Sequence, residues 1–134
     1  MRRGNGTNCM LDIRNLTRQK MPLLPFAAIV KEALGTTYEL SLVLCGSALS
    51  RRLSKERRGK DKAANVLSFP LTQETGEIFI DLAVAAREAK RDGISLAERV
   101  GILFIHGCCH LEGLTHGRRM EEHEQQLARR FLHS

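Results

Sequence analysis

Three histidines lie within eleven residues, in the segment HGCCHLEGLTH that spans residues 106–116. His106 and His110 are four residues apart, so on a helix their imidazoles share one face and can both reach one ion. Gly113 permits the positive φ with which many helices end, and the chain can then bring His116 toward the same ion. Three protein ligands and one open position are usual for a catalytic zinc site. The spacing therefore predicts one Zn²⁺ per chain, bound by His106, His110 and His116.

The spacing H-x3-H-x2-G-x2-H is also found in zinc peptidases, where a glutamate follows the first histidine and serves as the general base. In this chain that position is Gly107. A peptidase without its base would activate water poorly. The pattern therefore supports zinc but disfavours peptide hydrolysis, and a peptidase-like zinc hydrolase is kept as an alternative.

Two cysteines stand inside the histidine segment. Helical spacing turns Cys108 away from the histidine face and places Cys109 to its side. We expect both, like Cys9 and Cys45, to be small, reduced and partly buried thiols. A fourth protein ligand would make the zinc structural, and the nearest candidates for it are Cys109 and His123.

Several polar residues near the histidines could accept a hydrogen bond from the histidine ring nitrogen that does not bind the metal. On a helix surface, solvated side chains are the more ordinary expectation. The residues in question are Glu112, Glu121, Glu122 and His123.

A basic segment, RRLSKERRGKDK at residues 51–62, contains seven Lys or Arg in a chain whose formal net charge is +6. Most of these side chains are expected to be solvated, but the excess charge favours a polyanionic partner such as nucleic acid. Arg58 precedes Gly59, where a backbone without a side chain lets a ligand approach. Because a guanidinium can hold two phosphate oxygens and stabilise developing charge, Arg58 is the candidate catalytic residue.

The remaining sequence predicts the elements that position these residues. Periodicity and turn residues predict strands over 9–16, 38–45, 65–69 and 76–82, and helices over 22–34, 47–55, 83–91, 95–112 and 118–132. Pro70 is expected to end the third strand, Ser47 to cap the second helix, and Ser95 with Glu98 to form a capping box. The order predicts an α+β fold, with a small mixed β-sheet of about four strands packed by about five helices in a single domain.

Length and composition indicate a soluble globular protein. The 134 residues fit one domain, and hydrophobic and charged residues make up 43% and 27% of them. Residues 1–8 are polar and expected to be flexible. Since no apolar run approaches the roughly 18 residues of a membrane span, we expect a cytoplasmic protein without a membrane partner or a small-molecule cofactor.

Three segments together resemble the YbeY family of bacterial rRNA maturation factors, which are zinc-dependent endoribonucleases. They are RGKDKAANVLSFP (residues 58–70), GEIFI (76–80) and HGCCHLEGLTH (106–116). The resemblance implies that residues 9–134 form one YbeY-like metal-hydrolase domain, with the three histidines as metal ligands and Arg58 in the place of the family's functional arginine. It further implies cleavage of single-stranded RNA in rRNA maturation or ribosome quality control, with RNA and the ribosome as partners.

The chain departs from the family's usual pattern at three places. Leu114-Thr115 replaces a usual Tyr-Asp, Ala63-Ala64 a usual Pro-Thr, and Gly76-Glu77 a usual Gly-Asp. An Asp before the third histidine could orient a ligand or bind water, so its loss bears on the rate. None of the departures removes a predicted ligand.

As a mechanism, zinc would activate a water or polarise a phosphoryl oxygen, while Arg58 clamps the scissile phosphate. The nucleophile could be water or the RNA 2′-hydroxyl, and the general base stays open. A non-catalytic RNA- or ribosome-binding factor with structural zinc is a further alternative. The RNA target and the oligomeric state do not follow from the sequence.

Overall fold

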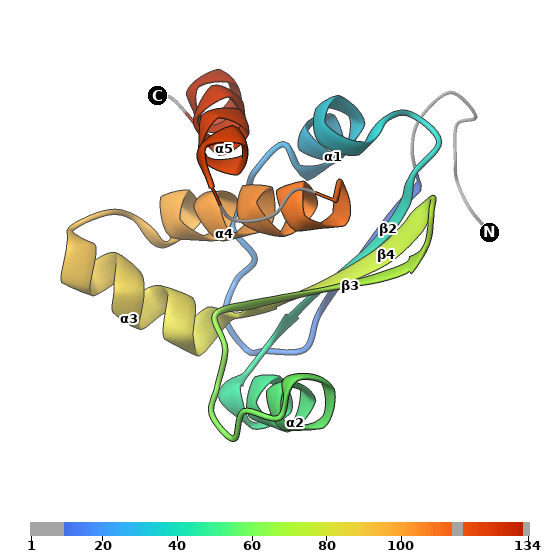
Figure 1. Ribbon diagram of the computed structural model, residues 1–134. Helices are drawn as coiled ribbons and strands as arrows, with labels where there is room; N and C mark the ends of the chain where they lie inside the picture. The colour runs from blue at the N-terminus through green and yellow to red at the C-terminus, as the bar shows by residue number, and fades with distance from the viewer. Residues whose placement is uncertain (1–9, 114–116, 133–134) are drawn as a thin grey trace.

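The computed structural model (Figure 1) describes residues 10–113 and 117–132. The strands are β1 Met10–Asn15, β2 Glu39–Cys45, β3 Val66–Thr72 and β4 Thr75–Asp81. The helices are α1 Phe26–Leu34, α2 Ser47–Arg58, α3 Leu82–Asp92, α4 Leu96–Leu111 and α5 Arg118–Phe131. The predicted order of elements and the α+β class are confirmed.

The four strands form one mixed sheet in the order β1-β2-β4-β3. β1, β2 and β4 are parallel, whereas β3 pairs antiparallel with β4 through the turn at residues 73–74. Parallel neighbours need a crossover, which α1 supplies between β1 and β2. The edges of the sheet are therefore β1 and β3.

The helices lie on both faces of the sheet. Figure 1 shows α1, α4 and α5 on one face and α2 on the other. The core lies under α4, where Ile78 and Ile80 of the central strand β4 are fully buried with Phe104. The rings of Phe104 and Phe26 meet edge to face with centroids 4.9 Å apart, which joins α4 to α1.

The prediction that Pro70 ends the third strand is wrong. β3 continues to Thr72, and Pro70 lies opposite Gly76 of β4. Proline lacks an N–H, but at an edge strand no further strand needs that donor. The pairing becomes irregular between Pro70 and Thr72.

The prediction that Ser47 caps the second helix is also wrong. Gly46 is the N-cap of α2, and Ser47 is its first helical residue. The Ser47 hydroxyl donates instead to Asp81 at 2.8 Å. The helix is also longer than predicted, because it ends at Arg58 and is followed by Gly59 with φ 73°.

The helix predicted over 22–34 begins only at Phe26, with Pro25 as its N-cap. The residue before a proline avoids helical backbone angles, which keeps Leu24 out of the helix. Farther along the chain, the Ser95 hydroxyl accepts the N–H of Glu98 at 3.0 Å, so the predicted cap at the start of α4 is confirmed.

The expectation of reduced, buried thiols is confirmed for Cys45, Cys108 and Cys109. Cys9 and the flexible segment predicted over residues 1–8 lie outside the described residues. Within the described part of the chain, no single helix is long and apolar enough to cross a membrane. The bent pair α3–α4 meets that test together, by length and composition only.

A buried carboxylate joins three elements at the end of β4. Asp81 accepts hydrogen bonds from the hydroxyls of Ser47 at 2.8 Å and Ser50 at 2.7 Å, and from the N–H of Val84 at 3.0 Å. These bonds tie α2 to β4 and cap α3. Burial, and secondarily the charge of Asp81, raises the pKa of the Cys45 thiol to about 12, so this thiol stays neutral.

We expect Asp81→Ala to lower the free energy of unfolding by about 2–4 kcal/mol, because it leaves buried donors without an acceptor and removes a helix cap. Urea unfolding measures the change. Asp61→Ala is the control, since Asp61 forms only an exposed ion pair with Arg51, and exposed pairs contribute little. Equal midpoints for Asp81→Ala and the wild type would contradict this role.

Candidate metal centre

α4 approaches the sheet closely at Gly107. The Ser68 hydroxyl of β3 donates to the Gly107 carbonyl oxygen at 3.3 Å. A Cβ at Gly107 would lie only 2.9 Å from Ser68 Oγ and 3.0 Å from Ile78 Cδ1. The position that holds the general base in zinc peptidases therefore faces the sheet, and a glutamate there would require the Ser68 and Ile78 side chains to shift.

His106 and His110 lie beside this contact, on one face of α4. Their Nε2 atoms are 3.1 Å apart, and their rings are nearly perpendicular at 83°. Two nitrogens bound tetrahedrally to one zinc at about 2.0–2.1 Å would be about 3.3 Å apart. The two donors therefore fit one ion.

The third predicted ligand, His116, lies in the segment 114–116, outside the described residues, as does Leu114-Thr115. The helix does end where the sequence predicts: Glu112 is the C-cap of α4, and Gly113 has φ 99°. The assignment of all three histidines as ligands stays a prediction.

Glu124 of α5 holds the first histidine from behind. Its Oε2 lies 2.6 Å from Nδ1 of His106, with about a quarter of each side chain exposed. When Nε2 faces a metal, Nδ1–H donates to such a carboxylate, which fixes the tautomer and the ring orientation. The pair thus supplies the support that a metal-binding histidine ordinarily has.

Glu124 is absent from the residues that the sequence singled out, although a signal for it exists. Met120 and Leu127 are the buried residues of α5. Glu124 is four residues after the first and three before the second, so it lies on the same stripe of the helix. A carboxylate in an apolar stripe needs a partner, and here that partner is His106.

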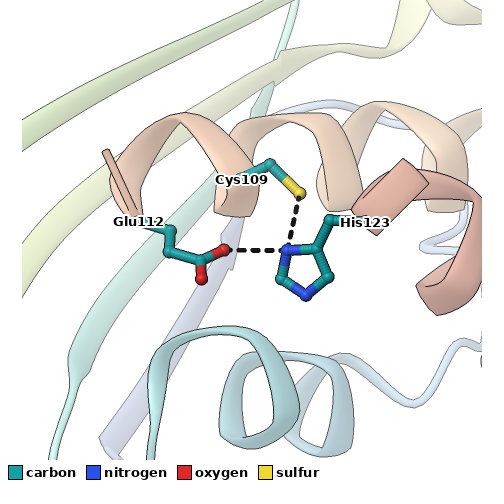
Figure 2. Close-up of side chains that lie close together, drawn as sticks. All are labelled: Cys109, Glu112 and His123. Atoms are coloured by element: carbon teal, nitrogen blue, oxygen red, sulfur yellow. Dashed lines mark hydrogen bonds and ion pairs between the residues drawn. The ribbon is translucent and has the colours of Figure 1, made fainter. Parts of the chain in front are cut away.

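A second polar cluster joins the last turn of α4 to α5. Nδ1 of His123 lies 2.9 Å from Oε1 of Glu112 and 3.8 Å from Sγ of Cys109 (Figure 2). The expectation of solvated side chains holds for Glu121 and Glu122, which are exposed. Glu112 and His123 contact each other instead.

Cys109 and His123 are also the candidates for a fourth zinc ligand. With Glu112 they form a group whose ligand atoms all lie within 4.8 Å of one another, and neither His106 nor His110 belongs to it. Burial, followed by the charges of Glu124 and Glu112, raises the pKa of Cys109 to about 12. These residues form a cluster of their own rather than a group with the two described histidines.

The basic segment lies on the other side of the sheet. Arg58 is the last residue of α2, is exposed, and makes no hydrogen bond or ion pair with the described residues. Two of its neighbours are engaged, Arg51 with Asp61 at 2.8 Å and Arg57 over the ring of Phe69 at 4.6 Å. Figure 1 places α2 and α4 on opposite faces, so the described structure does not bring Arg58 into contact with His106 or His110.

Comparison with known families covers nearly all of the chain. A family profile described as "Endoribonuclease YbeY" matches residues 11–132. The chain belongs to this family. The resemblance inferred from the three segments is therefore confirmed, and the chain is a member of a family of endoribonucleases.

Curated relatives agree with this membership. The Endoribonuclease YbeY of Anaeromyxobacter sp. (strain Fw109-5) is 37% identical over 115 residues, which cover 77% of this chain and 60% of the relative. That of Helicobacter pylori (strain Shi470) is 33% identical over 121 residues, covering 87% and 86%. The chain thus spans less than two thirds of the first relative and most of the second.

A solved structure supports the fold. A protein from Thermotoga maritima, determined in solution, matches with a TM-score of 0.66 and 21% identity, covering 88% of this chain and 86% of that one. The arrangement of helices around a mixed sheet is therefore shared with an independently determined structure.

We expect Glu124→Gln to weaken Zn²⁺ binding by about 10–100-fold, because the neutral amide holds the His106 N–H less firmly than the carboxylate does. Competition with a chelator of known affinity measures the change. Glu122→Gln on the same helix is the matched control, since Glu122 is exposed. Equal affinities for the two variants would show that Glu124 does not support the metal.

Proposed function

We propose that this chain is a zinc-dependent endoribonuclease that cleaves single-stranded segments of ribosomal RNA, in rRNA maturation and ribosome quality control in the cytoplasm. Its ligands would be His106, His110 and His116. One observation carries the proposal: in a member of this family, two Nε2 atoms lie 3.1 Å apart, and the first ring is held by a carboxylate. The curated relatives are named as endoribonucleases, which favours RNA over peptide as the substrate.

A bound zinc would supply a Lewis acid that polarises a phosphoryl oxygen. The residues of the chain would do the rest. His106 and His110 would present neutral imidazole nitrogens from one rigid helix, which holds their separation fixed. Glu124 would keep the His106 proton on Nδ1, so that Nε2 remains a lone-pair donor.

Arg58 would hold a substrate phosphate. To stabilise the negative charge that develops on the scissile phosphate, it and the histidines would have to meet at one phosphate, which α2 and α4 on opposite faces of the sheet do not reach together in the described structure. Of the nearby arginines, Arg51 is paired with Asp61 and Arg57 is stacked on Phe69. The exposed guanidinium of Arg58 is better placed to bind RNA than either of these. The other cations of residues 51–62 would hold the flanking backbone, so binding should weaken as salt rises.

The close contact at Gly107 bears on the general base. Gly107 stands where peptidases carry their carboxylate, and a side chain there would have to displace Ser68 and Ile78. An internal 2′-hydroxyl nucleophile would need less help from the protein than water does. The products distinguish the two routes: attack by the 2′-hydroxyl yields a 2′,3′-cyclic phosphate, whereas attack by water does not.

We expect His110→Ala to lose zinc from this centre and to lose cleavage, because one of two converging donors is removed. The measurement combines metal analysis with cleavage of a labelled single-stranded rRNA fragment by variant and wild type prepared identically. Wild-type zinc content in the folded variant would contradict the ligand assignment. Equal cleavage by both preparations would point to a contaminating nuclease.

We expect Arg58→Ala to keep its metal and fold but to lower kcat by about 10²–10³-fold, the usual loss when one group that stabilises transition-state charge is removed. Arg52→Ala is the matched control, since Arg52 is also exposed on α2. A higher KM with unchanged kcat would assign Arg58 to the flanking RNA instead of the scissile phosphate.

A further inference from the structure

The cluster of Cys109, Glu112 and His123 offers a sulfur, an oxygen and a nitrogen at the junction of α4 and α5 (Figure 2). We propose that it is a second metal site, which binds Zn²⁺ through Sγ of Cys109, a carboxylate oxygen of Glu112 and Nδ1 of His123. Because its donors differ from those of the histidine centre, the proposal does not rest on the proposed function.

The separations of the donor atoms suit one ion. Nδ1 of His123 is 2.9 Å from the carboxylate oxygen and 3.8 Å from the sulfur, and all three atoms lie within 4.8 Å of one another. Around a tetrahedral zinc with ordinary bond lengths, such atoms are about 3.3–3.6 Å apart. Shifts of a few tenths of an ångström bring the two distances from Nδ1 into range, and the distance between the sulfur and the oxygen, which is within 4.8 Å, would have to become about 3.5 Å.

Two of the three donor groups converge on one atom of the third. Figure 2 shows both contacts ending on the same ring nitrogen, while the other nitrogen points away from Cys109 and Glu112. That nitrogen carries either one proton or one lone pair. If protonated Nδ1 donates to Glu112, the sulfur can only share the same N–H as a second acceptor. If unprotonated Nδ1 accepts from the thiol, it lies next to the carboxylate with no proton between them. A cation placed between the three groups would instead be bound by one donor atom from each of them.

The surroundings favour a zinc-like ion. Cys109 is fully buried, whereas the side chains of His123 and Glu112 are 25% and 36% exposed. The solvent side admits an ion and leaves a fourth position for water. Thiolate and imidazole select zinc over magnesium or calcium. On binding, the S–H bond breaks, the electron pair stays on sulfur to form the metal bond, and the proton passes to solvent.

The ion would cross-link two helices beside the histidine centre. Cys109 and Glu112 belong to the last turn and C-cap of α4, and His123 belongs to α5. His123 is next to Glu124, which holds His106. A metal ion at the second site would therefore stabilise the position of α5, the helix whose Glu124 contacts His106.

Cobalt tests the site directly. The full chain, in a Cys9→Ser background, is stripped of metal with a chelator and titrated with Co²⁺. Only thiolate ligation gives a sulfur-to-cobalt charge-transfer band in the near ultraviolet, and the histidine centre has no thiolate. We expect this band, with about two Co²⁺ per chain when both centres are filled.

Cys109→Ala should lose the band and one ion, whereas Cys108→Ala should keep both. Cys108 is the matched control, since it is the adjacent residue, is equally buried and lies outside the group. His123→Gln should also lose the band, which keeps the test decisive if Cys109→Ala fails to fold. His110→Ala should keep the band. Loss of metal from the histidine centre can therefore be distinguished from loss of metal at the second site.

Absence of the band from the folded protein overturns the second site. So does its persistence in Cys109→Ala, or its loss in Cys108→Ala but not in Cys109→Ala. A band with only one Co²⁺ in the wild type, abolished by His110→Ala, would show one shared ion and likewise overturn the proposal.

Discussion

The contact between α4 and the sheet at Gly107 is the constraint on which the site depends. Because this position has no side chain, the helix lies directly on Ser68 and Ile78. That contact fixes the rotation of α4 about its axis, and the rotation decides where every other residue of the helix points. His106 and His110 thereby share one side of the helix next to Gly107, while Cys108 is fully buried. A bulkier residue at position 107 would rotate α4 and so redirect both histidine side chains without contacting either.

α5 packs against α4, and this packing places two of its polar residues next to side chains of α4. Met120 and Leu127 bury the inner stripe of α5, and that stripe places two consecutive polar residues against α4. Glu124 meets His106, and His123 meets Cys109 and Glu112. Consecutive residues on a helix point about 100° apart, so one short segment can serve two clusters. Displacing α5 would therefore loosen both clusters together.

The sequence predicted which helices and strands exist better than it predicted where they begin and end. Periodicity located the four strands and five helices found in residues 10–113 and 117–132, because burial imposes that periodicity directly. The errors at Ser47 and Pro70 have tertiary causes: the Ser47 hydroxyl finds a better acceptor in buried Asp81, and Pro70 is tolerated because β3 lies at an edge. The facing pair His106 and His110 followed from helical spacing alone. Glu124 could not be paired with His106 in advance, since that pairing depends on how α5 packs.

The position of Arg58 on the face of the sheet opposite the histidines limits the kind of RNA that could contact both. α2 and α4 lie on opposite faces of the sheet (Figure 1), and β3 forms the edge that a substrate would pass between them. An RNA held at Arg58 and at the histidines together would have to turn around this edge. Double-stranded nucleic acid resists such a bend, since duplex DNA is stiff over roughly 150 base pairs, whereas a single strand turns freely. If both sites act on one RNA molecule, the proposed preference for single strands would follow from the thickness of the sheet and would need no recognition of bases.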